Sequence, residues 1–150
     1  MEITWIVKLA EEKIDFLLSN WPILGVLIFI LLWSTYTDAT EMKIYNEMNL
    51  FSLITRLLLI PFFPLDMWDI IGGLVFFIAF LIVGMMAPNT NIGGDIKFAG
   101  TFGLWAGAQL GLLSLGIAIL MIIPISLIKR TSVPLAPFVT IGFFVSMILI

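Results

Sequence analysis

IIGGLVFFIAFLIVGMMA, at residues 70–87, is a stretch without a single charged side chain. Its length is close to what a helix needs to cross the hydrocarbon core of a bilayer, roughly 20 residues. The rest of the chain has the same character, because 61% of its 150 residues are hydrophobic and 11% are charged. A soluble domain typically carries about 25% charged residues. The sequence therefore predicts an all-α fold, a polytopic membrane helix bundle with lipid as the solvent for much of its surface.

About six transmembrane helices are expected, each a largely apolar run bounded by charges, prolines or glycines. They cover about residues 21–37, 48–63, 70–87, 95–108, 110–128 and 134–150. No charge occurs between Lys97 and Lys129, and glycines lie on both sides of Gln109. We therefore expect two short helices that turn near Gln109, with a kink at Pro124 in the second.

Positive charges predict the orientation of this bundle. The basic loop residues are Lys43, Lys97, Lys129 and Arg130, which fall in the first, third and fifth loops. The second and fourth loops contain neither Lys nor Arg. The positive-inside rule then places the basic loops in the cytoplasm. The sequence predicts a multi-pass protein of the cell (cytoplasmic) membrane with both chain ends outside.

Residues 1–20 differ from the rest, because apolar and charged side chains alternate there with the 3.6-residue period of a helix. The apolar set is Ile3, Ile6, Val7, Ala10, Ile14, Leu17 and Leu18, and the charged set is Lys8, Glu11, Glu12 and Asp15. We expect an amphipathic helix that lies in the membrane interface. Residues 1–150 are thus predicted to form one membrane domain, with an interfacial helix at 1–20 and a transmembrane bundle at 21–150.

Two further features are expected to be structural. Arg56 interrupts the second span and is predicted either to extend towards a membrane interface or to pair with an acidic side chain such as Glu47 or Glu41. Asp66 and Asp69 fall on the predicted outer side and are left out of any site. A repeat of small residues every four positions, which lets helices approach closely, is formed by Ala99, Gly103, Gly107 and Gly111.

The absence of cysteine and histidine limits the kinds of catalytic and metal site that this chain can form. It excludes disulfides, thiolate zinc sites and a Ser-His-Asp triad, so carboxylates and lysines are the remaining acid–base groups. The net charge of −3 argues against a nucleic-acid partner, which needs a basic surface. We expect no metal and no cofactor.

Two aspartates at span ends are candidates for catalysis, because charged residues at membrane depth are costly and usually functional. Asp38 ends the first span and shares a polar stripe with Ser34 and Glu41, although a helix end that emerges into water would look the same. Asp95 follows Gly93 and Gly94, whose bare backbone would let a peptide approach closely. A tight turn followed by an ordinary helix cap explains these residues equally well.

The predicted topology puts Asp38 and Asp95 on the cytoplasmic side at similar depth. Two carboxyl groups that come close share a proton, because both cannot easily ionise together. The protonated group then donates to a peptide carbonyl, while the ionised group takes a proton from an attacking water. Lys97 either biases which partner ionises or serves only as a topology-setting charge. These residues predict an aspartic endopeptidase without a covalent intermediate.

At these positions the sequence resembles the type IV prepilin peptidases, a family of membrane aspartic peptidases. The first family motif matches at Asp38, Ile44 and Asn46, with Tyr45 in place of a proline. The second, of the Gly-x-Gly-Asp kind, matches at Gly94, Asp95, Lys97, Gly103, Trp105 and Gly107, with Ile92 in place of the first glycine. A third stretch matches at Val133, Pro134, Ala136, Pro137, Phe138 and Gly142. The resemblance covers roughly residues 22–150.

The resemblance implies that Asp38 and Asp95 are the catalytic pair. It implies positioning of the substrate or of the loops by Asn46, Gly93, Gly94 and Lys97. The implied substrate is a prepilin or pilin-like precursor, cut after a short basic leader beside its hydrophobic helix at the cytoplasmic membrane face. Larger members carry a segment with paired cysteines and also methylate the new N-terminus. We therefore expect a minimal form without methyltransferase activity.

Three other functions remain open at this point. A proton-coupled transporter or channel subunit would use the same carboxylates as a relay, although such sites tend to lie near the midplane. A non-catalytic scaffold of a pilus or secretion machine would not need them. An intramembrane protease of the presenilin kind would cut within a span.

Overall fold

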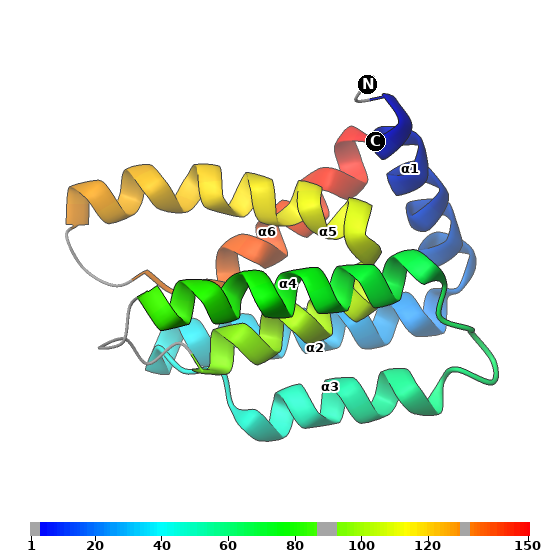
Figure 1. The fold of residues 1–150 in the computed structure, drawn as a ribbon, viewed down its shortest axis with the longest axis horizontal. Helices are drawn as coiled ribbons and strands as arrows, with labels where there is room; N and C mark the ends of the chain where they lie inside the picture. Colours follow the sequence, from blue (N-terminus) through cyan, green and yellow to red (C-terminus); the bar gives the residue numbers. More distant parts are fainter. Residues whose placement is uncertain (1–3, 87–92, 130–132) are drawn as a thin grey trace. The chain divides into compact units, whose positions relative to one another are not determined.

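The regular structure of the described residues is entirely helical, which confirms the predicted all-α fold (Figure 1). The computed structural model describes residues 4–86, 93–129 and 133–150. Its helices are α1 (Thr4–Ser19), α2 (Trp21–Glu41), α3 (Asn46–Leu58), α4 (Met67–Met86), α5 (Gly93–Lys129) and α6 (Ala136–Leu149). They form two compact units, one from residues 1–43 with 109–150 and the other from residues 44–108. The C-terminal part of α5 therefore belongs to the first unit and its N-terminal part to the second.

Three of the described helices are long and apolar enough to cross a membrane, namely α2, α4 and residues 93–126 of α5. Helix α6 is apolar but shorter. Helix α3 has 13 residues, fewer than a span requires, and it includes Glu47 and Arg56. The length and apolar composition of these helices support the prediction that this is a membrane protein. The number of membrane spans stays a prediction.

Helix α5 is interrupted at Gly107. The backbone there has φ 73° and ψ 172°, a conformation that an L-residue with a side chain rarely adopts. The predicted turn near Gln109 thus corresponds to a break two residues earlier, at the glycine that tolerates this backbone. Pro124 lies inside the second segment of α5, where the helix continues on both sides.

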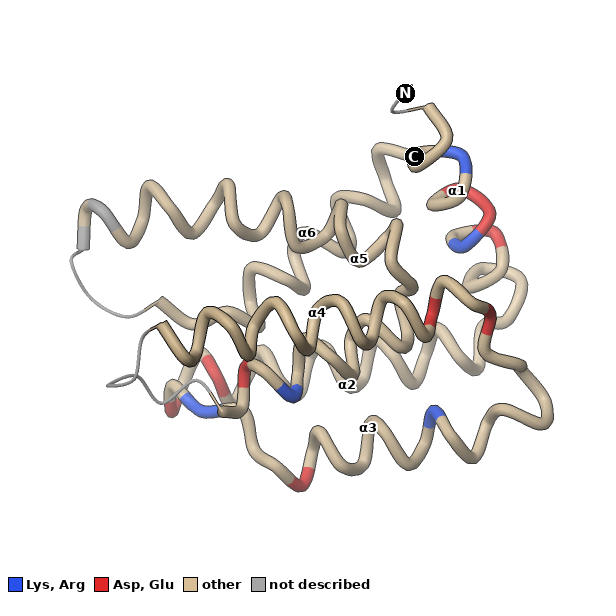
Figure 2. Tube along the Cα trace, viewed as in Figure 1, with Lys and Arg blue, Asp and Glu red and all other residues tan. Residues whose placement is uncertain are grey.

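In the first unit, α2 and α6 pack along each other and α1 packs on α2. Helix α1 buries Ala10, Ile14 and Leu17, and Lys13 is the one charged residue of this helix that is buried with them. Its exposed charged residues include Lys8, Glu11, Glu12 and Asp15 (Figure 2). This separation confirms that α1 is amphipathic, because the buried residues recur at helical spacing. Its position in the membrane interface stays a prediction.

In the second unit, α4 and the first segment of α5 meet through glycines. A Cβ added to Gly72 would lie 2.7 Å from the backbone nitrogen of Ala108, and one added to Gly103 would overlap the backbone of Gly72. Backbones can come this close only where no side chain separates them. Gly103 therefore packs closely against α4, as predicted for the repeat of small residues. Gly107, another member of this repeat, instead forms the break in α5.

Arg56 is buried in the second unit and pairs with Asp69, so the predicted partners Glu47 and Glu41 are wrong. The Arg56 Nη2 atom lies 2.9 Å from Asp69 Oδ2, and both side chains are at most 2% exposed. The guanidinium also donates to the carbonyls of Leu104 at 3.2 Å and Phe63 at 2.9 Å. Arg56 sits in the last turn of α3 and Asp69 in the first turn of α4. A short connection therefore brings Asp69 to Arg56, whereas Glu47 is at the other end of α3.

We predict that Arg56→Met lowers the free energy of unfolding by about 3–5 kcal/mol, because it leaves the Asp69 carboxylate buried without its ion-pair partner. Chemical unfolding in detergent measures the change. Lys43→Met removes an exposed positive charge and serves as the control, with little expected effect. The double variant Arg56→Met, Asp69→Leu should recover much of the loss, and a loss as large as that of the single variant would contradict the assignment.

Gly107→Ala should destabilise the protein by about 1–3 kcal/mol, because the side chain makes φ 73° and ψ 172° unfavourable. Thermal unfolding compares it with Gly116→Ala. A Cβ at Gly116, also in α5, meets no atom within 4 Å. Alanine there should stabilise the helix by about 0.5–1 kcal/mol. Equal effects of the two substitutions would show that α5 is not broken at Gly107.

Candidate active site

Asp38 lies three residues before the end of α2 and is only 4% exposed. Its Oδ2 atom accepts a hydrogen bond of 2.8 Å from the backbone nitrogen of Ala136. Ala136 is the first residue of α6, and the first N–H groups of a helix have no acceptor within that helix. The carboxyl group therefore caps α6 and benefits from the positive end of the helix dipole. Sequence reasoning did not pair Asp38 with this segment, because the two are 98 residues apart.

The polar stripe predicted on α2 lies mainly inside the first unit. Ser34, one turn before Asp38, is 1% exposed, whereas Glu41 is exposed. The Oγ atom of Ser34 has no hydrogen-bond partner among the described residues. Thr37 is buried as well and donates to the backbone carbonyls of Trp33 and Ser34, each at 3.2 Å. The end of α2 thus buries a carboxyl group and two hydroxyl groups inside the first unit.

Asp95 is half-buried in the first turn of α5, after Gly93 and Gly94. The two glycines have different surroundings. A Cβ at Gly94 would lie 2.6 Å from the carbonyl oxygen of Ile44, so Gly94 is required by the segment that precedes α3. A Cβ at Gly93 would meet no described atom within 4 Å. The bare backbone that sequence reasoning assigned to both glycines is therefore open only at Gly93.

Hydrogen bonds join the start of α3 to the start of α5. Lys97 Nζ donates to Asn46 Oδ1 at 2.7 Å, and Asn49 Nδ2 donates to the carbonyl of Gly94 at 3.2 Å. The structure thus brings the predicted positioning residues Asn46, Gly94 and Lys97 together in the second unit. Asn49 is 4% exposed and was missed by sequence reasoning. Its signal was present, because it follows Asn46 by three residues on the same helix face.

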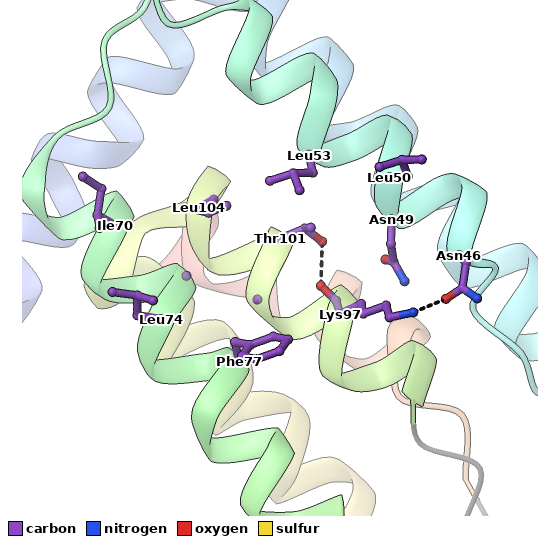
Figure 3. A pocket seen from close by; sticks show the side chains of 12 residues that line it. Asn46, Asn49, Leu50, Leu53, Ile70, Leu74, Phe77, Lys97, Thr101 and Leu104 are labelled. Carbon is purple, nitrogen blue, oxygen red and sulfur yellow. Dashed lines mark hydrogen bonds between the residues drawn. The ribbon is translucent and has the colours of Figure 1, made fainter.

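A groove with a cavity volume of about 610 Å³ runs between α3, α4 and the first segment of α5 (Figure 3). Its polar lining residues are Asn46, Asn49, Lys97 and Thr101, and the others are glycines or apolar side chains such as Leu53, Leu74 and Phe77. Asn46 and Lys97 come from the first turns of α3 and α5, as Figure 3 shows. The groove is therefore polar near the helix starts and apolar beyond them. Asp95 shares the first turn of α5 with this polar end.

Asp38 belongs to the first unit and Asp95 to the second, so their pairing stays a prediction. Within residues 4–86, 93–129 and 133–150, no group of three or more carboxylate side chains is placed to hold a metal ion. The departures from the family motif fall at Tyr45, which is exposed, and at Ile92, which lies outside the described residues.

A comparison with known protein families matches residues 25–127 to the type IV leader peptidase family. The matched range includes most of α2 with Asp38, all of α3 and α4, and most of α5 with Asp95. Neither the curated proteins nor the solved structures gave a match. The match spans more than half of the chain and confirms the resemblance found in its motifs. The chain therefore belongs to the type IV leader peptidase family.

Proposed function

We propose that this protein is an aspartic endopeptidase that removes the short basic leader of a pilin-like precursor. Membership of the leader peptidase family supports a peptidase with a pilin-like substrate. The observation that carries the aspartic mechanism is the burial of Asp38, which is 4% exposed at the end of an apolar helix. A carboxyl group in that position is costly and is retained where it has a function.

In the proposed reaction, Asp38 and Asp95 come together around one water molecule and share one proton. The ionised carboxylate takes a proton from the water as its oxygen attacks the peptide carbonyl carbon. The protonated carboxyl group gives its proton to the carbonyl oxygen. The tetrahedral intermediate then collapses, and the leaving amine receives a proton from the pair. Neither step needs a metal, a cofactor or a covalent enzyme intermediate.

The groove of the second unit supports a substrate that joins a polar cleavage site to an apolar helix. Its polar end lies at the first turns of α3 and α5, where Asp95 also lies, and its remaining lining is apolar. A precursor with its scissile bond at Asp95 would place the hydrophobic segment that follows the bond along this lining. Burial of that segment would stabilise the complex at about 25 cal/mol per Å² of apolar surface.

The proposed site faces the cytoplasm at the cell membrane, because the basic residues Lys43, after the end of α2, and Lys97, near the start of α5, lie next to the two aspartates in the sequence. The chain contains no cysteine, and the proposed activity is leader removal without methylation of the product.

We predict that Asp38→Asn and Asp95→Asn each reduce kcat by about 10²–10⁴-fold, because asparagine cannot exchange the proton. Purified protein in detergent is incubated with a precursor that has a basic leader and a hydrophobic helix, and mass spectrometry identifies the products. Asp38→Asn keeps an oxygen that accepts the Ala136 hydrogen bond, so it should fold normally. Glu41→Gln, on the exposed end of α2, is the control and should cleave like wild type.

Retention of cleavage at the leader boundary by both asparagine variants would contradict the aspartic mechanism. A wild type that is inert towards all pilin-like precursors, but drives proton-dependent uptake in vesicles, would favour a transporter. A protein whose role in pilus assembly survives both substitutions would favour a scaffold.

Leu53→Trp should raise KM for the precursor by roughly tenfold or more with a smaller change in kcat. The indole would fill apolar space that the substrate helix needs, and one side chain of that size contributes about 1.5–3 kcal/mol when it is buried. Leu57→Trp is the matched control, because Leu57 is on the same helix and 48% exposed. Equal KM values for the two variants would show that the precursor does not occupy the groove.

A further inference from the structure

The turn that begins α6 has an unusual arrangement of backbone donors. Pro134 and Pro137 have no N–H, and they flank Leu135 and Ala136. The N–H groups of Phe138 and Val139 donate to the carbonyl of Leu135, each at 3.1 Å.

The N–H groups of Leu135 and Ala136, between the two prolines, therefore make no hydrogen bond within α6. Ala136 N donates to Asp38 Oδ2, and the amide of Leu135 also acts on this carboxyl group.

A second contact between α2 and α6 restrains the one between Asp38 and Ala136. Thr35 and Thr140 share a hydrogen bond of 2.8 Å between their hydroxyl oxygens. Thr35 precedes Asp38 by three residues and Thr140 follows Ala136 by four, so both pairs lie on the facing surfaces of α2 and α6. A Cβ at Gly142 would overlap the carbonyl of Ser114, which shows how closely α6 also packs on the second segment of α5. The N-terminal turn of α6 is therefore held in a fixed position relative to the end of α2.

The contact also makes the two oxygens of Asp38 inequivalent. A backbone N–H can only donate, so Oδ2 must act as an acceptor towards Ala136 in either protonation state. A proton on this carboxyl group is therefore favoured on Oδ1, which does not accept from Ala136. The interaction also removes rotational freedom from the carboxyl group, which lowers the cost of reaching one reactive orientation.

We propose that the segment Pro134–Pro137 is a positioning element, whose backbone amides hold the Asp38 carboxyl group in one orientation, with Ala136 bound to Oδ2. This inference rests on the proposed function, because it assigns a role to Asp38 in peptide cleavage. The positioning groups are backbone amides, so the side chains of Leu135 and Ala136 are not required for it. The two prolines limit the donors that reach the carboxyl group, because neither can add an N–H.

The test is an amide-to-ester substitution, with lactic acid incorporated in place of Ala136. The ester removes the N–H and preserves the side chain. We expect kcat to fall about tenfold or more with KM nearly unchanged, and the pH dependence of kcat to change. The matched control is the α-hydroxy analogue of valine in place of Val139, which removes the internal hydrogen bond to Leu135 in the same turn. The control should leave the pH dependence of kcat unaltered.

Equal effects of the two esters on kcat and on its pH dependence would overturn the positioning role, while cleavage by wild type would leave the proposed function intact. Thermal unfolding gives a readout that does not require activity. The ester at position 136 should lower Tm in wild type and in Asp38→Asn, where an acceptor oxygen remains, and have little further effect in Asp38→Leu. Equal effects in all three backgrounds would overturn the contact itself. The ester could lower Tm only where an acceptor remains at position 38, in a protein that cleaves no precursor. That result would reject the catalytic role of Asp38 and leave its contact with Ala136 as a helix cap alone.

Discussion

A polar group inside an apolar helix bundle needs a partner within the protein, because lipid and packed side chains offer none. Arg56 and Asp38, both buried, meet this need in part or wholly through backbone groups. Arg56 uses Asp69 together with the carbonyls of Leu104 and Phe63, and it also lies over the ring of Trp105. Asp38 uses the first amide of α6. The need to pair these two groups explains the contact of α3 with α4 at Arg56 and the contact of α2 with α6 at Asp38.

The two polar arrangements serve different ends. In the Arg56 network each of the three guanidinium nitrogens donates, and Asp69 in turn accepts from the backbone of Asp66. Such a network, with the charge paired and each nitrogen donating, stabilises a fold. Asp38 accepts from backbone amides alone, and Ser34, one turn before it, has a hydroxyl without a described partner. This difference supports a structural role for the arginine and a chemical role for Asp38.

The three glycines of the second family motif, Gly94, Gly103 and Gly107, have different functions in the structure. Gly94 lets the chain at Ile44 pass over the start of α5, and Gly103 brings α5 against Gly72 of α4. Gly107 supplies a backbone conformation that ends the first segment of α5. Together they place the first turn of α5, with Asp95 and Lys97, at the polar end of the groove. The repeat of small residues is therefore more than a packing surface, since one of its members changes the backbone.

Hydrophobic periodicity and composition by themselves determined the helical fold, the amphipathic character of α1 and the break near the middle of α5, because these features depend on local side-chain pattern. The sequence motifs also identified Asn46, Gly94 and Lys97, which the second unit brings together. The partner of Arg56 was predicted wrongly, because the choice between Asp69 and Glu47 depends on the path of the chain between α3 and α4. The different surroundings of Gly93 and Gly94, and the contact of Asp38 with Ala136, were decided by tertiary structure alone. Such contacts join segments distant in sequence, and only the packing of whole helices fixes which backbone groups meet.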